Sequence, residues 1–216
     1  MSNTPGKKRP WRAVLWALLA ILVAALVLIA ALLWPILFPA PKGMSGHGVV
    51  EGFPSSVRAT GDDGRTRTLT VAAEDGSPVA LDQLSAGQRL VVTGEGYDAS
   101  LGIYVALCRI PESVDLKPGP CLGGVPSTEE DADQTADVIE WAPSNWINND
   151  WAWRLFGARS FDDEALGTFR AYLEVPAPAD EFVDCRVEAC GLYTRNDHTA
   201  LDNRMQDLYL PVAFVD

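Results

Sequence analysis

The sequence has few of the residues, and none of the short motifs, from which most metal and enzyme sites are built. Its 216 residues include only two histidines, His47 and His198, and its four cysteines form no Cys-x-x-Cys unit, so a zinc site is not expected. The Gly-x-Ser-x-Gly, His-Glu-x-x-His, phosphate-loop and EF-hand patterns are also missing. We therefore expect no catalytic residue, no metal and no cofactor, and a protein that is not an enzyme.

Polar side chains are missing from one long stretch, the 22 residues from Ala13 to Trp34. A helix of that length is about 33 Å long, enough to cross a hydrocarbon core of about 30 Å. Four cations precede it: Lys7, Lys8, Arg9 and Arg12. Because cations resist translocation, we predict a basic cytoplasmic N-terminus at 1–12, a single transmembrane signal-anchor helix at 13–38, and a C-terminal part outside the cell membrane.

A cleaved secretory signal is the alternative interpretation of this stretch. Its apolar region would be about 7–15 residues long, shorter than the run found here. The best cleavage site, after Ala40, has bulky Phe38 two positions earlier and Pro41 directly after it. These neighbours would block a signal peptidase, so an uncleaved anchor is predicted.

Positive charge is scarce in the rest of the chain. The whole sequence has 17 basic and 29 acidic residues, and four of the basic ones precede the apolar run, which leaves 13 basic residues and a net charge of −16 beyond it. Such a surface repels phosphate backbones, so nucleic acid is not an expected partner. It would attract cations or basic protein patches, or it keeps an exported domain soluble.

All four cysteines follow the predicted anchor. Cys108 and Cys121 are separated by twelve residues, and Cys185 and Cys190 by four. In an oxidising compartment four cysteines suggest two disulfides. The sequence permits three pairings, of which local pairing is the simplest.

Long amphipathic helical patterns are also missing after the anchor. Residues 39–64 are rich in Pro and Gly and predict a short stalk. Beyond them, short segments rich in Val, Leu, Thr and Tyr alternate with turns and predict seven strands in a β-sandwich over 65–216. These segments are Thr66–Ala72, Arg89–Thr93, Gly102–Arg109, Thr168–Val175, Phe182–Val187, Cys190–Thr194 and Leu208–Val215.

An insertion at about 127–165 interrupts this pattern with a dense group of aromatic residues. Its candidate ligand-binding residues are Trp141, Trp146, Trp151, Trp153 and Phe156. Such rings could line a cleft or stack on a planar ligand or a sugar. The alternative is that they pack a 39-residue connection onto the sheet.

The segment Thr194–Asp207 is rich in charged and amide side chains. It could hold a cation or place His198 near carboxylates as a base. The alternative is a polar connection held by ion pairs, such as Arg204 with Asp197 or Asp207. A Ser-His-Asp cluster formed only in space would make the protein an exported hydrolase, but nothing in the sequence identifies a nucleophile.

Three stretches resemble a known family. Gly87–Tyr97 followed by Gly102–Cys108 is similar to the strand, Gly-x-Gly turn and Cys-terminated strand of the neocarzinostatin-type apoproteins, which are actinobacterial immunoglobulin-like sandwiches that carry a chromophore. Val183–Cys190 matches that family's Asp-Cys-x4-Cys hairpin, and Pro211–Phe214 resembles its last strand. The resemblance covers roughly 66–126 and 166–216.

The resemblance implies an all-β, immunoglobulin-like, seven-stranded sandwich with local Cys108–Cys121 and Cys185–Cys190 disulfides. It also implies a cleft lined with apolar and aromatic groups, between a hairpin and the open face of the sandwich. We predict a membrane-anchored, extracellular binding or structural module of the cell envelope, without catalytic activity, whose partner is an envelope protein or a small hydrophobic or aromatic ligand. The alternatives are a carrier of such a ligand or of haem and, third, the exported hydrolase.

Overall fold

The chain forms two compact units, Met1–Pro41 and Lys42–Asp216. The computed structural model describes residues 10–37, 43–124 and 140–215, so the basic N-terminus before residue 10 and the acidic part of the predicted insertion lie outside the described residues. In the first unit, helix α1 (Pro10–Leu37) covers nearly all of the predicted span. Over the described residues, no helix meets the combined length and hydropathy of a membrane-spanning segment. The anchor at 13–38 stays a prediction.

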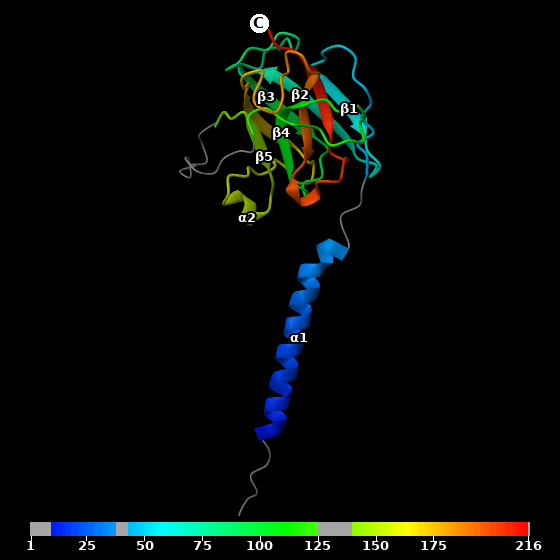
Figure 1. Cartoon of the computed structure of the whole chain (residues 1–216), viewed down its shortest axis with the longest axis vertical. Helices are drawn as coiled ribbons and strands as arrows, with labels where there is room; N and C mark the ends of the chain where they lie inside the picture. Colours follow the sequence, from blue (N-terminus) through cyan, green and yellow to red (C-terminus); the bar gives the residue numbers. More distant parts are fainter. Residues whose placement is uncertain (1–9, 38–42, 125–139, 216) are drawn as a thin grey trace, which may run out of the picture. The chain divides into compact units, whose positions relative to one another are not determined.

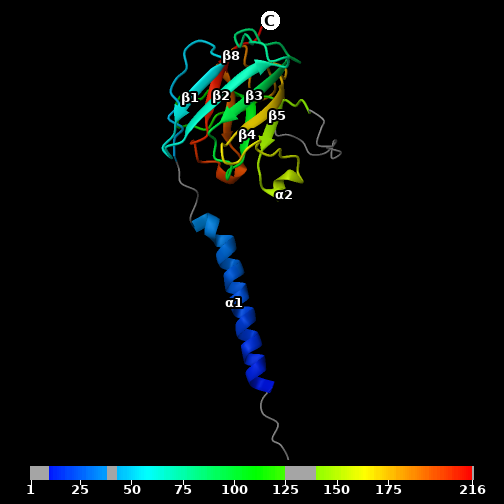
Figure 2. The same cartoon turned by 180° about the vertical axis from the view of Figure 1, so that it is seen from behind.

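The second unit contains two antiparallel four-stranded sheets (Figures 1 and 2). The first sheet has the order β1-β2-β3-β6 and the second the order β5-β4-β7-β8. The strands are β1 (Ser56–Thr60), β2 (Thr66–Ala73), β3 (Arg89–Glu95), β4 (Ile103–Arg109), β5 (Ser144–Ile147), β6 (Phe169–Glu174), β7 (Cys190–Asn196) and β8 (Leu208–Val212).

The core lies between these sheets. Strand β6 shows why, because Phe169, Ala171 and Leu173 alternate with more exposed residues and are almost fully buried. Strand β3 alternates in the same way, and one continuous apolar cluster joins residues of both sheets, such as Leu90 of β3 and Leu192 of β7. The core, both sheets and both disulfides lie within residues 42–216, which form a self-contained folding unit.

The β fold and both local disulfides, Cys108–Cys121 and Cys185–Cys190, are confirmed. The predicted number of strands is wrong: the described residues contain eight strands and not seven. Strands β1 and β5 were not predicted, and the predicted strand Phe182–Val187 does not form. There the side chains of Asp180 and Asp184 accept hydrogen bonds from the backbone N–H groups of Phe182 and Arg186, and these local turns compete with a sheet.

The segment predicted as a stalk belongs largely to the second unit. Strand β1 pairs with β2 across the turn that contains Gly61 and Gly64. Upstream of β1, Met44 forms an isolated bridge with Arg204, and His47 is buried against Tyr209 of β8. Residues 43–50, called the strap below, are therefore packed on the folded unit and do not form a free stalk.

The Trp-rich insertion closes one side of the sandwich. Its residue Ala142 bridges to Leu173 of β6, and β5 then joins the other sheet beside β4. Asn145 of β5 links the two sheets, because its side-chain amide donates to the carbonyl O of Tyr172 at 2.9 Å and accepts from the Tyr172 N–H at 3.2 Å. This amide supplies the Tyr172 N–H with an acceptor and gives the Tyr172 carbonyl a second donor beside the Ala142 N–H.

The strap yields a prediction about pH. His47 Nε2 lies 3.1 Å from the carbonyl O of Tyr209, and burial lowers the pKa of His47 despite this hydrogen bond. The unfolded chain therefore binds a proton more readily at this site, so the His47 contribution to the free energy of unfolding should decrease as the pH falls below about 6.5. In urea denaturation of residues 42–216 at pH 5–7, wild type should lose stability relative to His47→Gln as the pH is lowered.

Burial raises the pKa of Asp207 to about 7 against the opposing effect of Arg204, and this group contributes with the opposite sign. Because Asp207 is present in every variant, the difference between His47→Gln and wild type isolates His47. Equal pH slopes in these two proteins would contradict the prediction.

Candidate functional site

The candidate site begins with a row of three side chains across the second sheet. Tyr104 of β4 is paired with Trp146 of β5 on one side and with Arg195 of β7 on the other. Its neighbours in the strand, Ile103 and Val105, are fully buried in the core. Because side chains alternate along a strand, Tyr104 and its two partners face away from the core.

Four rings pack together at this row, two from the row itself and two from the segments that follow β5 and β7. His198, in the 3₁₀ helix η1 (His198–Ala200), lies edge-on to Trp153 with ring centroids 4.7 Å apart and to Trp146 at 5.3 Å. Trp146 also contacts Trp153 at 5.6 Å and Tyr104 at 5.9 Å. These four residues, Tyr104, Trp146, Trp153 and His198, are called the aromatic cluster below. Their separations fall within the range of favourable aromatic contacts.

The carboxylate of Asp197 holds this arrangement in place. Its Oδ2 accepts hydrogen bonds from Trp146 Nε1 at 2.9 Å and from Asn148 Nδ2 at 2.8 Å. Its Oδ1 accepts from the backbone N–H of Thr199 at 2.9 Å and from the Thr199 hydroxyl at 2.6 Å. One buried side chain therefore fixes β5 to η1 and orients the Trp146 ring.

Electrostatics follow from these contacts. Burial favours the neutral form of Asp197, but the hydrogen bonds from Thr199, Trp146 and Asn148 outweigh it and lower the pKa of this carboxyl. Burial and the nearby Asp197 charge raise the pKa of Tyr104, whose hydroxyl lies 3.0 Å from His198 Nδ1. Tyr104 therefore remains a neutral phenol at physiological pH.

The short helix α2 (Trp151–Arg154; Figure 1) carries Trp153 of the cluster, and further apolar side chains lie in and just after it. The Asp150 side chain caps it by accepting from the Ala152 N–H. Trp151 is 74% exposed and Phe156 is 55% exposed, and Phe156 contacts Trp153 at 6.3 Å. Exposed large apolar groups gathered in one turn are typical of binding surfaces.

The five residues predicted to bind a ligand therefore do not form one group in the structure. Trp146, Trp153 and Phe156 come together, and Trp151 projects from the neighbouring helix. Trp141 lies elsewhere, packed against Tyr172 of β6 with the Arg89 guanidinium 5.2 Å from its ring centroid. Trp141 thus matches the packing alternative, because it attaches the insertion to the first sheet.

Tyr104 was not predicted as a site residue, and Asp197, Arg195 and His198 were considered only within the segment Thr194–Asp207, as a cation site or a base. The signal available in the sequence was that Tyr104 occupies an outward position of the predicted strand Gly102–Arg109. Arg195 gives no such signal, because it follows the predicted strand Cys190–Thr194. His198 Nδ1 lies within hydrogen-bond distance of the Tyr104 hydroxyl, whereas the hydrolase hypothesis requires a serine at that place. Over the described residues, no three His, Cys, Asp or Glu side chains are grouped to hold a metal ion.

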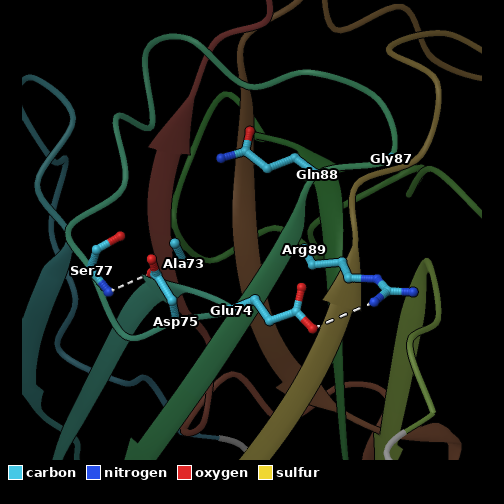
Figure 3. Close-up of a pocket in the computed structure, with 7 residues that line it drawn as sticks. All are labelled: Ala73, Glu74, Asp75, Ser77, Gly87, Gln88 and Arg89. Carbon is cyan, nitrogen blue, oxygen red and sulfur yellow. Dashed lines mark hydrogen bonds and ion pairs between the residues drawn. The ribbon is translucent and has the colours of Figure 1, made fainter.

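A separate hollow of about 460 Å³ lies at the turn after β2 and the start of β3 (Figure 3). It is lined by Ala73, Glu74, Asp75, Ser77, Gly87, Gln88 and Arg89. Arg89 already pairs with Glu74 at 3.4 Å and with Glu174 at 3.8 Å. With its cation engaged and no aromatic lining residue, this hollow is less suited to an aromatic ligand than the cluster.

Comparison with known proteins gives a distant structural likeness and no sequence match. No family model and no curated protein matches the chain. The solved structure of macromomycin is similar with a TM-score of 0.35 and 16% identity, over 68% of this chain and 99% of that one. This is at most a distant likeness of fold, so the functional conclusions below depend on the site itself.

The Asp197 contacts predict a stability effect. Asp197→Ala would leave the donors of Trp146 and Asn148 without their acceptor, at a cost of about 2–4 kcal/mol in the free energy of unfolding. Urea denaturation of residues 42–216 measures this. The control Asp150→Ala removes an exposed helix cap and should cost about 1 kcal/mol or less.

Gly102 offers a second test of the role of the Asp197 carboxylate. A Cβ atom added at Gly102 would collide with Asp197 Oδ2 and Asn148 Nδ2, so Gly102→Ala should displace the carboxylate. The tryptophan emission of this variant should change as the Trp146 environment changes. A loss of less than 1 kcal/mol in Asp197→Ala, with unchanged emission in Gly102→Ala, would contradict the role given to Asp197.

Proposed function

We propose that residues 42–216 form a non-catalytic binding module that carries a small, planar, aromatic ligand on the aromatic cluster. The observation that supports this is the set of ring contacts among Trp146, Trp153 and His198, next to the exposed Phe156. Rings held by packing and hydrogen bonds lose little entropy when a flat ligand stacks on them. Haem is also planar and sugars also stack on aromatic rings, so their affinities should be compared with those of simple aromatic ligands.

The prediction is saturable quenching of tryptophan fluorescence by planar aromatic ligands. Residues 42–216 contain only four tryptophans, Trp141, Trp146, Trp151 and Trp153. Trp153→Ala removes the ring that joins His198 to Phe156 and should weaken binding about 2- to 12-fold, which corresponds to one aromatic contact. Titration with naphthalene derivatives, haem and oligosaccharides would identify the class that binds.

Trp141→Phe is the matched control, because it removes a tryptophan that packs on the first sheet and should leave the dissociation constant unchanged. Equal effects of the two substitutions would refute the proposed location. If no member of the panel quenches, the exposed Trp151, Leu155 and Phe156 favour the rival, a docking surface for an envelope protein.

We also propose that this module lies outside the cell on a single membrane anchor. The proposal is supported by the apolar run with its preceding cations and by the two disulfides, which persist in oxidising compartments. Protease treatment of intact cells should remove the module and leave the N-terminus protected. Release of the whole protein by a carbonate wash would contradict the anchor.

A further inference from the structure

We infer that the ligand of the aromatic cluster is a planar aromatic anion, with its rings on Trp153 and His198, which pack over the buried Trp146, and its acidic group at Arg195 and Lys117. The acidic group is a carboxylate, a sulfonate or a phosphate, since all three accept hydrogen bonds from a guanidinium. This inference rests on the proposed function and specifies its ligand class.

Arg195 is the third member of the row across the second sheet, directly beside Tyr104. Its guanidinium carbon lies 5.6 Å from the Tyr104 ring centroid, so the cation borders the aromatic cluster. A ligand that stacks on the cluster therefore has a positive charge within reach at one end. An aromatic ring joined to an acidic group has the matching arrangement.

The hydrogen-bonding capacity of Arg195 is largely unused within the described part of the chain. A guanidinium has five N–H donors, and the recorded hydrogen bond of Arg195 is a long one, from Nη1 to the carbonyl O of Pro118 at 3.4 Å. Its Nε is buried and has no partner among the described residues. An anion would supply the acceptors that this guanidinium lacks.

A second cation stands next to Arg195. Lys117 is exposed and directly precedes Pro118, whose carbonyl O accepts from Arg195 Nη1, so a second cation lies in the neighbouring segment. Partial desolvation and then the charges of Arg195 and Arg204 lower the pKa of Lys117, in a unit whose net charge is −16. Repulsion among them would be relieved by a bound anion.

Two carboxylates near these cations already accept other donors, and the charge of one of them, Asp207, also acts on Arg195. Asp207 pairs with Arg204 at 2.8 Å, and Asp197 accepts the hydrogen bonds of Trp146, Asn148 and Thr199. Asp202 also acts on Lys117, and it opposes the effect of the two arginines. Arg195 has no recorded salt bridge to a described residue, so it is the cation best placed to receive a ligand's charge.

The test uses two probes with the same rings. 1-Anilinonaphthalene-8-sulfonate carries a sulfonate, and N-phenyl-1-naphthylamine is the same ring system without it. Both are titrated into residues 42–216 at about 150 mM salt and followed by probe fluorescence. A charge-assisted hydrogen bond should make the sulfonate bind at least about 10-fold more tightly.

Arg195→Met keeps an apolar stem and removes the charge. It should lower the affinity for the sulfonate to that for the neutral probe and leave the neutral probe unchanged. The matched control is Arg89→Met, because Arg89 also lies over an aromatic ring, that of Trp141, but borders the first sheet. This variant should bind both probes like the wild type. Lys117→Gln, at an exposed position, should weaken only the sulfonate and covers the case in which Arg195→Met fails to fold.

The outcomes separate the two proposals. If both probes bind equally and neither Arg195→Met nor Lys117→Gln affects the sulfonate, the anion inference is wrong while the aromatic carrier survives. If neither probe binds, the proposed function and the inference fall together. If Arg89→Met weakens the sulfonate as much as Arg195→Met, the charge effect is general and the inference is overturned.

Discussion

The buried carboxylate of Asp197 is the contact on which the candidate site depends. Removing a charge from water is costly, and this one is compensated by side-chain donors from β5 and its following residue and by two donors from Thr199. Because Trp146 and Asn148 are about 50 residues from Asp197 in the sequence, these hydrogen bonds form only when the fold is complete. Gly102 is part of the same constraint, since a larger residue would occupy the space of the carboxylate. The ring positions are therefore a consequence of tertiary structure.

The two segments that surround the second sheet have different roles. The strap at 43–50 covers β8, where His47 lies against Tyr209 and the Val50 N–H donates to the Tyr209 hydroxyl. The insertion instead adds β5 at the opposite edge and then α2, which leaves Trp151 and Phe156 exposed. One end of the sheet is thus protected by packing, whereas the other presents apolar side chains to solvent. Exposure of such groups opposes solubility, and a bound ligand would offset that cost.

Much of the fold was predictable from the sequence because alternation and turn residues are local signals. Strands β2, β3, β4, β6, β7 and β8 were found in this way, and the family resemblance gave the disulfide pairing. Strand β1 was missed because Pro and Gly on both sides suggested a stalk, and β5 because it has only four residues, all buried, and so shows no alternation. The aromatic residues of the site were visible as a group, but their separation into packed Trp141 and clustered Trp146 and Trp153 depends on which sheet each segment joins. Tyr104, Asp197 and Arg195 are distant from the insertion in sequence, and only the pairing register places them beside it.

Charge explains how such a site could be selective. A unit with a net charge of −16 repels anions at long range, so an acidic ligand gains nothing from the general field of the protein. At physiological ionic strength that field is screened beyond about 8 Å, whereas a guanidinium in direct contact with a ligand is not. Anions without an aromatic ring would meet the repulsion without the stacking contacts, and neutral aromatics would stack without satisfying Arg195. Only a ligand that combines an aromatic ring with an acidic group would contact both the rings and Arg195, and the net negative charge of the unit would disfavour other anions.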